Sequence, residues 1–498
     1  MPEIGATSKP LVAPDTGALD KFTALDGFYL TELGNAERLH HTYGQDLKWV
    51  AGASYASTGN FYIWNDSRWV LDESARVLSM AQDVIRNLRQ MIIDALNGGW
   101  TADETEPLLK FWNRSEHESM GHNMIMLLRP MIAIKESEFD ADPMLLCVKN
   151  GVLNLKDGTF RCPKREDLLT KQTGCNYDPS ATAPVWEQFL KETCNSDEEL
   201  IRYLRQCAGL CLTGLVEEHL FFIIVGRAGT GKSTFQEALK YVWGDYCIGI
   251  DPNSLATAGK AEGGKARPDI AKLRGARLVF ANESRAGLRL DEGLVKSLTG
   301  GDTMTARELY QKEFDFVPQF KLWLRTNNAP VFDGADTGMQ RRIQRVPFDT
   351  ICLNKDPKLA NKLKAEADGI LNWALIGFQD YQTNGIVVPQ VVKDSTKEYI
   401  KGLDSIGLFL AERCELKGSH TQAAGELYQQ YRNWVEDQGG HPVAVVRFKE
   451  QMETRGFTHQ SIHGCKRWVG LKLVGANSWK QHATVVPDQE YQEHAAIG

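Results

Sequence analysis

Residues 220–235, LFFIIVGRAGTGKSTF, decide the fold because they join an apolar strand to a glycine-rich loop and a helix. The apolar run 220–225 precedes the pattern G-x-x-x-x-G-K-[ST], which is typical of a nucleotide-binding P-loop. Glycines let successive N–H groups wrap phosphate oxygens, and the helix N-terminus adds a favourable dipole for an anion. The residues expected to hold the nucleotide are Gly226, Arg227, Ala228, Gly229, Thr230, Gly231, Lys232, Ser233 and Thr234.

Two side chains of this loop carry charge or bind metal in the expected chemistry. Lys232 is expected to reach the β- and γ-phosphates of ATP, and the Ser233 hydroxyl to ligate Mg²⁺. The alternative is a glycine-rich turn that binds nothing. The strand before the loop and the helix after it, expected over 232–243, favour the nucleotide site.

Length and composition limit the number of domains and the class of protein. The 498 residues are enough for about two to four domains with substantial cores. The net charge of −7 means that any nucleic-acid surface is local. Ten cysteines without a C-x-x-C pair fit a reduced, cytoplasmic interior. No apolar run approaches the roughly 18 residues that a membrane span needs, so no membrane partner is expected.

An acidic residue and an amide follow the next two expected strands. The strand over 276–281 ends in Asn282 and Glu283, and Glu283 can polarise an attacking water as general base. The strand over 320–325 leads to Asn327, whose amide can hold that water from the opposite side. Each residue alone is common at a strand end, and the spacing of Glu283 from the P-loop favours a function for it.

A hairpin and an arginine pair complete the central region. Residues 303–310 and 314–316 are expected to form the arms of a hairpin with 311–313 at its tip. Arg341 and Arg342 come just before another apolar strand. Such a pair is most often solvated surface, yet a ring of ATPase subunits needs an arginine that reaches the γ-phosphate of a neighbour.

The C-terminal region predicts a small basic domain. Two helices and then a hairpin over 461–474 indicate a winged helix, and residues 441–480 contain seven basic residues against two acidic ones. Lys466 and Arg467 in the hairpin are therefore candidates for contact with nucleic-acid phosphates. The alternative is a solvated face of an interaction domain.

With these residues in place, the chain resembles the superfamily III helicases, in particular the phage, plasmid and poxvirus type of primase–helicase. The resemblance covers about residues 28–475. It rests on the P-loop together with TELGNAERL, NGVLNLKDG, LRGARLVFANE, LTGGDTMTARELYQ, TNNAP, DTGMQRRIQRVPF and DGILNWALIGF. It implies an α/β fold: an AAA+-like P-loop ATPase core with an α/β N-terminal domain and a C-terminal winged-helix domain.

The resemblance also implies roles for individual residues. ATP sites lie between the subunits of a ring, usually a hexamer, and single-stranded or forked DNA passes through its channel. The implied catalytic residues are Lys232, the acid Glu283, the sensor Asn327 and an arginine finger, which is Arg342 or else Arg341. Ser233 and Glu283 are implied to bind Mg²⁺, and Lys312 at the hairpin tip is implied to contact DNA. The chain departs from the pattern at Asn282, where related ATPases often carry an acid. No primase domain precedes the helicase part, so a separate primase is the expected partner.

These observations predict an ATP-dependent replicative DNA helicase of a phage, plasmid or integrated element. The first alternative is a DNA-binding initiator or loader that uses ATP only to assemble, and the second, a small-molecule P-loop kinase, leaves the C-terminal domain unexplained. The expected domains are a flexible tail (1–25), an N-terminal domain (26–180), a helical collar (181–215), the ATPase domain (216–390), the winged helix (391–475) and a second tail (476–498).

Overall fold

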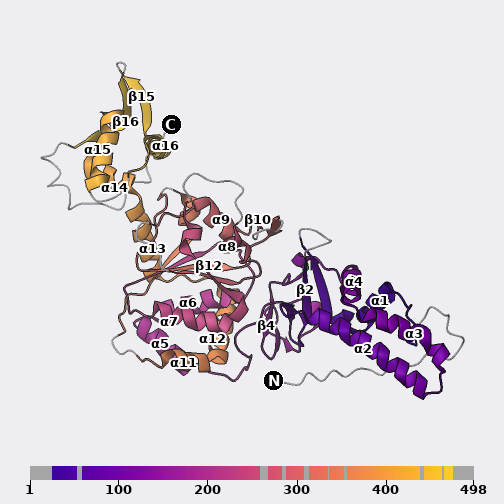
Figure 1. Cartoon of the computed structure of the whole chain (residues 1–498). Helices are drawn as coiled ribbons and strands as arrows, with labels where there is room; N and C mark the ends of the chain where they lie inside the picture. Colours follow the sequence, from indigo (N-terminus) through magenta and orange to yellow (C-terminus); the bar gives the residue numbers. More distant parts are fainter. Residues whose placement is uncertain are drawn as a thin grey trace.

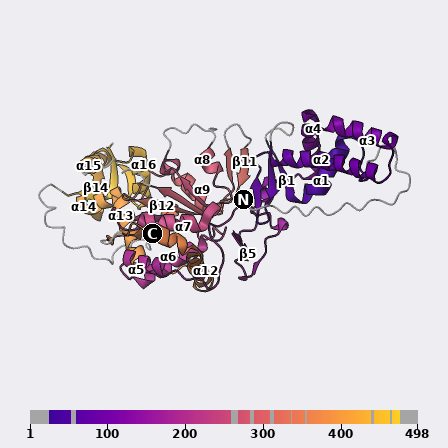
Figure 2. The same cartoon turned by 60° about the horizontal axis from the view of Figure 1, so that its bottom comes forward.

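The computed structural model describes residues 25–52, 59–257, 267–282, 288–307, 313–334, 336–352, 356–437, 442–462 and 465–474. The two expected tails lie outside these ranges. Figures 1 and 2 show a central parallel sheet between two further groups of elements, the N-terminal helices at one end and the C-terminal elements at the other.

The N-terminal part combines helices with a small antiparallel sheet of order β1-β2-β3. Strands β2 and β3 form a hairpin with Asn65 and Asp66 in its turn, and Trp64 lies opposite Trp69. The long helix begins at Arg76, since the Asp72 carboxylate accepts hydrogen bonds from the first helical N–H groups. The elements are α1 (Glu32–Tyr43), β1 (Leu47–Ala51), β2 (Gly59–Trp64), β3 (Trp69–Leu71), α2 (Arg76–Asn97), α3 (Ala102–Ser115) and α4 (Glu118–Leu128).

A second small sheet connects this part to the centre. It consists of β4 (Leu145–Val148), β5 (Gly151–Asn154) and β6 (Phe160–Arg161). Leu146, Val148 and Leu153 belong to the same hydrophobic core as one face of the parallel sheet, whereas Cys147 and Val152 form a separate cluster with Leu169. Packing therefore groups these strands with the central unit, although the sequence analysis grouped them with the N-terminal domain.

The central sheet has five parallel strands in the order β13-β7-β12-β9-β8. The strands are β7 (Phe221–Val225), β8 (Cys247–Ile250), β9 (Leu278–Asn282), β12 (Lys321–Thr326) and β13 (Ile343–Pro347). Helix α7 (Lys232–Trp243) follows β7 over the expected residues. The expected strands near 220, 276 and 320 are thus confirmed, each within two residues at its start.

Alternate residues of each strand enter two separate cores, as the period of two in a strand requires. Phe222 and Ile224 face one core, whereas Phe221 and Ile223 face the other. Five helices cover the first face: α5 (Pro184–Thr193), α6 (Glu198–Leu210), α7, α11 (Leu359–Ala365) and α12 (Ala367–Asn384). The short α8 (Pro268–Ala271) and α9 (Glu292–Gly300) lie on the second face (Figure 1).

The hairpin expected near 303–316 is present. Its arms are β10 (Met304–Arg307) and β11 (Glu313–Phe316), paired from Met304 with Phe316 to Arg307 with Glu313. The hairpin lies next to the N-terminal part of the chain. The Arg274 guanidinium lies 5.2 Å from the centre of the Phe314 ring of the hairpin and forms an ion pair with Glu136 of the N-terminal part. The tip, including Lys312, lies outside the described residues.

The C-terminal part begins with α13 (Gln390–Leu403), which packs along β13. It continues as α14 (Ser405–Arg413), β14 (Cys414–Ala423), α15 (Ala424–Asp437), α16 (Val445–Thr454), β15 (Thr458–Ile462) and β16 (Cys465–Leu473), with sheet order β14-β16-β15. The two expected helices and the hairpin are confirmed. Strand β14 was missed because it is mostly exposed and has no alternating apolar pattern.

The close crossing of α6 and α12 depends on two glycines. A Cβ added to Gly377 would meet the Arg205 carbonyl oxygen at 1.9 Å, and one added to Gly209 would meet the Phe378 nitrogen at 2.2 Å. We expect Gly377→Ala to lower the free energy of unfolding by about 1–3 kcal/mol through overpacking, measured by urea denaturation. Gly402→Ala in α13 is the control, because an added Cβ there meets nothing within 4 Å. Equal stability of the two variants would contradict the close crossing.

Candidate nucleotide-binding site

The expected site residues follow strands that end together at one edge of the central sheet. Thr326 of β12 lies opposite Val225 of β7, and Arg325 lies opposite Asn282 of β9. The carboxyl ends of these three strands therefore meet. The chain leaves β7 for the far edge of the sheet and later returns to β13 on its other side. Ligands of open parallel sheets bind at such a reversal of strand order.

Glycines allow the loop after β7 to pass close to another segment of backbone. A Cβ on Gly226 would meet the Phe348 carbonyl oxygen at 1.9 Å, and Gly229 and Gly231 both have a φ of +85°. Gly231 is the N-cap of α7 and provides no side-chain cap, so the first N–H groups of this helix are left for another acceptor. This arrangement suits an anion such as a phosphate.

Lys232 is only 7% exposed and folds back over the loop. Its Nζ donates to the carbonyl oxygens of Gly226 and Arg227, both at 2.6 Å. These acceptors are neutral, so the contacts solvate the ammonium group without cancelling its charge. Ser233, the next residue, is exposed at the start of α7, as a hydroxyl that binds a metal ion must be.

Two segments that the sequence analysis missed form the surroundings of the loop. Phe189 and Thr193 of α5 lie against Gly231, where an added Cβ would meet Thr193 Oγ1 at 2.8 Å. On another side, the Cys352 N–H donates to the Gly229 carbonyl at 3.1 Å. Neither segment carries a motif, and both are distant from the loop in sequence. No sequence signal could have identified them.

Of the residues expected opposite the loop, Asn282 and Asn327 lie in the described part of the chain. Glu283, which follows Asn282, lies outside it. Asn327 is exposed directly after β12, beside the strand that ends at Asn282. The Asn282 Oδ1 is buried without a hydrogen-bond partner among the described residues, which leaves an amide oxygen for a metal ion or its water. Together with Ser233, these donors fit nucleotide-bound Mg²⁺.

The two adjacent arginines have different surroundings. Arg342 is 6% exposed, and its guanidinium donates to Thr299 Oγ1 at 3.2 Å and to the Gly338 carbonyl at 2.9 Å. Burial lowers the pKa of Arg342, and the charge of Arg341 lowers it further. Arg341 ends the short α10 (Thr337–Gln340) and is exposed. Only Arg341 of the pair therefore presents its side chain to a neighbouring molecule.

The basic C-terminal hairpin is described except at its tip. Lys466 is exposed. Arg467 is half-buried and donates to the Thr421 side chain at 3.1 Å and to its carbonyl at 3.2 Å. Arg467 thus joins β16 to β14 within the domain, while Lys466 faces solvent.

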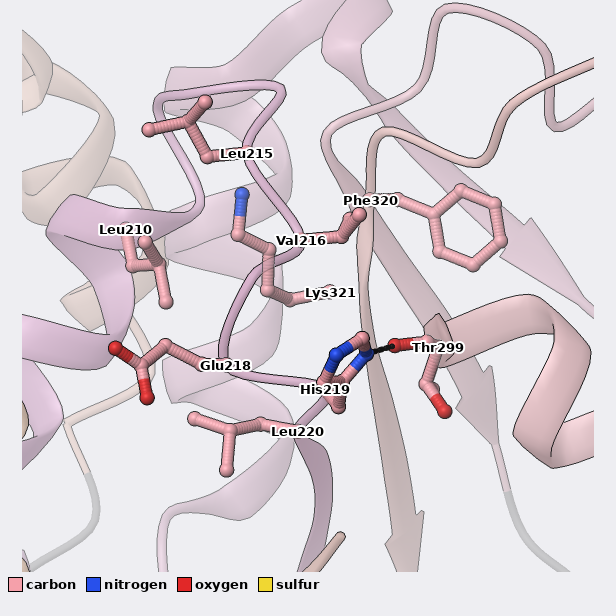
Figure 3. Close-up of a pocket in the computed structure, with 9 residues that line it drawn as sticks. All are labelled: Leu210, Leu215, Val216, Glu218, His219, Leu220, Thr299, Phe320 and Lys321. Carbon is pink, nitrogen blue, oxygen red and sulfur yellow. Dashed lines mark hydrogen bonds between the residues drawn. The ribbon is translucent and has the colours of Figure 1, made fainter. Parts of the chain in front are cut away.

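A small cavity lies at the opposite edge of the sheet from the loop (Figure 3). It has a volume of about 10 Å³, near the lower limit for one water molecule. Lys321 lines it and donates to the Thr213 carbonyl at 2.7 Å, and burial lowers the pKa of Lys321 to about 7. His219 donates through Nδ1 to the Thr299 carbonyl at 3.0 Å. The cavity is a packing gap and does not contribute to the nucleotide site.

Two family models match the chain. The model described as "D5 N terminal like" matches residues 36–195, and one described as a family of unknown function (DUF5906) matches residues 224–342. A protein named "Putative helicase L207/L206" from Acanthamoeba polyphaga mimivirus is 27% identical over 80% of this chain and 46% of its own length. "Primase D5" of Fowlpox virus is 24% identical over 61% of this chain and 37% of its own length. These matches support the phage and poxvirus type of primase–helicase family for this chain.

The chain spans less than half the length of these two viral relatives. The solved C-terminal region of NrS-1, in its apo form, has a similar fold, with a TM-score of 0.51 and 12% identity over 89% of this chain and 99% of that region. Among the described residues no helix is long and apolar enough to cross a membrane.

The different surroundings of the arginines predict different costs of removal. Arg342→Met removes two hydrogen bonds from a buried site and should lower the free energy of unfolding by about 1–3 kcal/mol. Arg341→Met removes an exposed side chain and should change it by less than about 0.5 kcal/mol. Urea unfolding of both variants measures the difference. An equal loss of free energy of unfolding in both variants would contradict the hydrogen bonds of Arg342 to Thr299 and Gly338 of its own chain.

Proposed function

We propose that this protein is an ATP-dependent replicative DNA helicase that works as a ring. The observation that carries the proposal is the 226–233 loop, with Lys232 and the uncapped start of α7, at the sheet edge where β9 and β12 also end. The central unit is then an AAA+-like P-loop ATPase core. The names of the viral relatives, a helicase and a primase, support a role in replication.

ATP hydrolysis would use residues from all three strand ends. The backbone of the loop and Lys232 bind the β- and γ-phosphates, and Lys232 exchanges its contacts with loop carbonyls for phosphate oxygens. Glu283 accepts a proton from the attacking water, and Asn327 orients that water. Ser233, the Asn282 side-chain oxygen and Glu283 would hold Mg²⁺, which would neutralise charge on the phosphates.

The arginine finger completes the site from a neighbouring subunit. Arg341 is the better candidate, since Arg342 is bound to Thr299 and Gly338 of its own chain. A finger supplied in trans requires a ring, for which six subunits is the expected number. Single-stranded or forked DNA then passes through the channel past Lys312.

The C-terminal part supports DNA binding. Its element order α14-β14-α15-α16-β15-β16, with β14 added to the terminal hairpin, supports our proposal that it is a winged helix. Lys466 projects from the hairpin and is suited to contact phosphates of any sequence. We assign this domain to the capture and positioning of DNA.

Removal of the Lys232 charge tests the ATPase assignment. We expect Lys232→Ala to reduce ATP turnover by about a hundredfold or more, because the transferred phosphate loses its buried cation. Lys240→Ala, an exposed lysine of the same helix, should retain wild-type turnover. Glu283→Gln should bind ATP and hydrolyse it slowly.

The outcome also separates the alternatives. Near-wild-type turnover by Lys232→Ala would remove the ATPase assignment. Turnover of the wild type that single-stranded DNA does not change, with no separation of forked DNA, would instead favour an initiator or loader.

Lys466 predicts a measurable share of DNA affinity. Lys466→Ala should weaken binding and reduce the slope of log K against log salt by about 1, because one counterion fewer is released. Arg467→Ala should also lower the stability of the domain, since Arg467 bridges to Thr421. Lys110→Ala, in an ion pair on α3 far from this domain, serves as control. An unchanged slope for Lys466→Ala would exclude this residue from the DNA interface.

A further inference from the structure

Two side chains of helix α16 in the C-terminal domain donate hydrogen bonds to the two carboxylate oxygens of Asp333, a residue of the central unit. The Arg447 Nε donates to Asp333 Oδ2 at 2.9 Å, and its Nη2 contacts the same oxygen. The Gln451 Nε2 donates to Asp333 Oδ1 at 2.7 Å. The Asp333 side chain is only 14% exposed, so these charge-assisted bonds are partly shielded from water.

The segment that carries Asp333 is enclosed on further sides. A Cβ on Gly334 would meet the backbone nitrogen of Asp404 at 2.9 Å, and the Tyr399 hydroxyl donates to the Pro330 carbonyl. Asp404 in turn accepts a bond from Arg455, at the end of α16, at 2.6 Å. Residues 330–334 are therefore held between the start of the C-terminal domain and its helix α16.

A short series of hydrogen bonds connects Asp333 to the exposed arginine. The Asp336 N–H donates to the Asp333 carbonyl at 3.0 Å, and Asp336 Oδ1 caps α10 by accepting from the Met339 N–H at 3.0 Å. The Gln340 side chain donates back to the Gly334 carbonyl at 2.6 Å. Arg341 is the residue after Gln340. The position of α10, and with it that of Arg341, thus depends on residues 333–336.

Helix α16 has three faces, which follow from its period of 3.6 residues. Phe448 and Met452 are buried in the core of the C-terminal domain. Arg447 and Gln451 face Asp333. The third face includes Val446, which is 67% exposed. The face that binds Asp333 and the exposed face therefore lie on different sides of the helix.

We propose that Asp333 is a positioning residue of the ATPase, through which the Arg447–Gln451 face of α16 couples the C-terminal domain to Arg341. This inference rests on the proposed function, since it requires ATP turnover that DNA stimulates. DNA bound to the C-terminal domain displaces α16, and the displacement reaches α10 and the finger through Asp333.

The test uses the full chain and steady-state ATP turnover with and without saturating single-stranded DNA. Arg447→Ala and Asp333→Asn should each lower the ratio of DNA-stimulated to DNA-free turnover about five- to tenfold, the range of a typical coupling energy. The KM for ATP should stay within about twofold, because neither side chain belongs to the nucleotide pocket. The charge exchange Arg447→Asp with Asp333→Arg should restore at least about half of the stimulation.

Controls distinguish coupling from a general loss of structure. Glu453→Gln changes a charge on the exposed side of the same helix and should keep wild-type stimulation. Thermal unfolding of every variant establishes that it is folded, and Gln451→Ala provides a milder break of the same contact. DNA affinity is measured separately so that each comparison is made at saturation.

The outcomes separate this inference from the proposed function. A wild-type chain without ATP turnover would overturn the proposed function and the coupling with it. A wild-type chain with DNA-stimulated turnover, and folded Arg447→Ala and Gln451→Ala variants with the same stimulation, would overturn the coupling alone. Loss of stimulation that the charge exchange fails to restore would reduce the contact to a structural tether and would also overturn the coupling.

Discussion

The parallel pairing of β7 with its neighbours is the constraint on which the rest of this structure depends. Parallel strands in register end at the same edge, so the loop after Val225, Asn282 itself and the residue after Thr326 are brought together by backbone hydrogen bonds. Strands β7, β9 and β12 are buried on both faces. A slip by one residue would exchange the two cores, and the register is strongly fixed for that reason.

The sequence could predict this edge because its signals are local. A glycine pattern after an apolar run specifies the strand, the loop and the start of α7, and the polar residues 282 and 327 mark two other strand ends. The order of the strands is a different matter. It depends on long-range packing, such as Trp323 in one core and Leu324 in the other, that no local pattern contains. The family resemblance predicted an AAA+-like core without a strand order, and the D5 N terminal like match covers residues 36–195, outside this sheet.

What the sequence could not provide is set by contacts between distant segments. Thr193 reaches Gly231, and the Cys352 N–H reaches Gly229, across large separations in the chain. The hydrogen bond from Arg447 to Asp333 likewise joins residues that are 114 positions apart in the chain. Aspartate and arginine at these positions look like ordinary surface residues in the sequence. Their partners, and therefore their roles, appear only when the domains are placed against each other.

The pairing of β13 with β7 also determines which of Arg341 and Arg342 is buried. The Arg342 carbonyl accepts a hydrogen bond from the Phe221 N–H at 2.7 Å, so the pairing of β13 with β7 already includes the residue before β13. That bond fixes the backbone of Arg342 beside the sheet and directs its side chain to Thr299. Arg341 still belongs to the end of α10 and stays exposed. The resemblance placed Arg342 before Arg341 as the finger, because the motif alone does not show which side chain is buried. The register of β13 buries Arg342, so the strand pairing that builds the proposed nucleotide site also leaves Arg341 as the exposed arginine of the two.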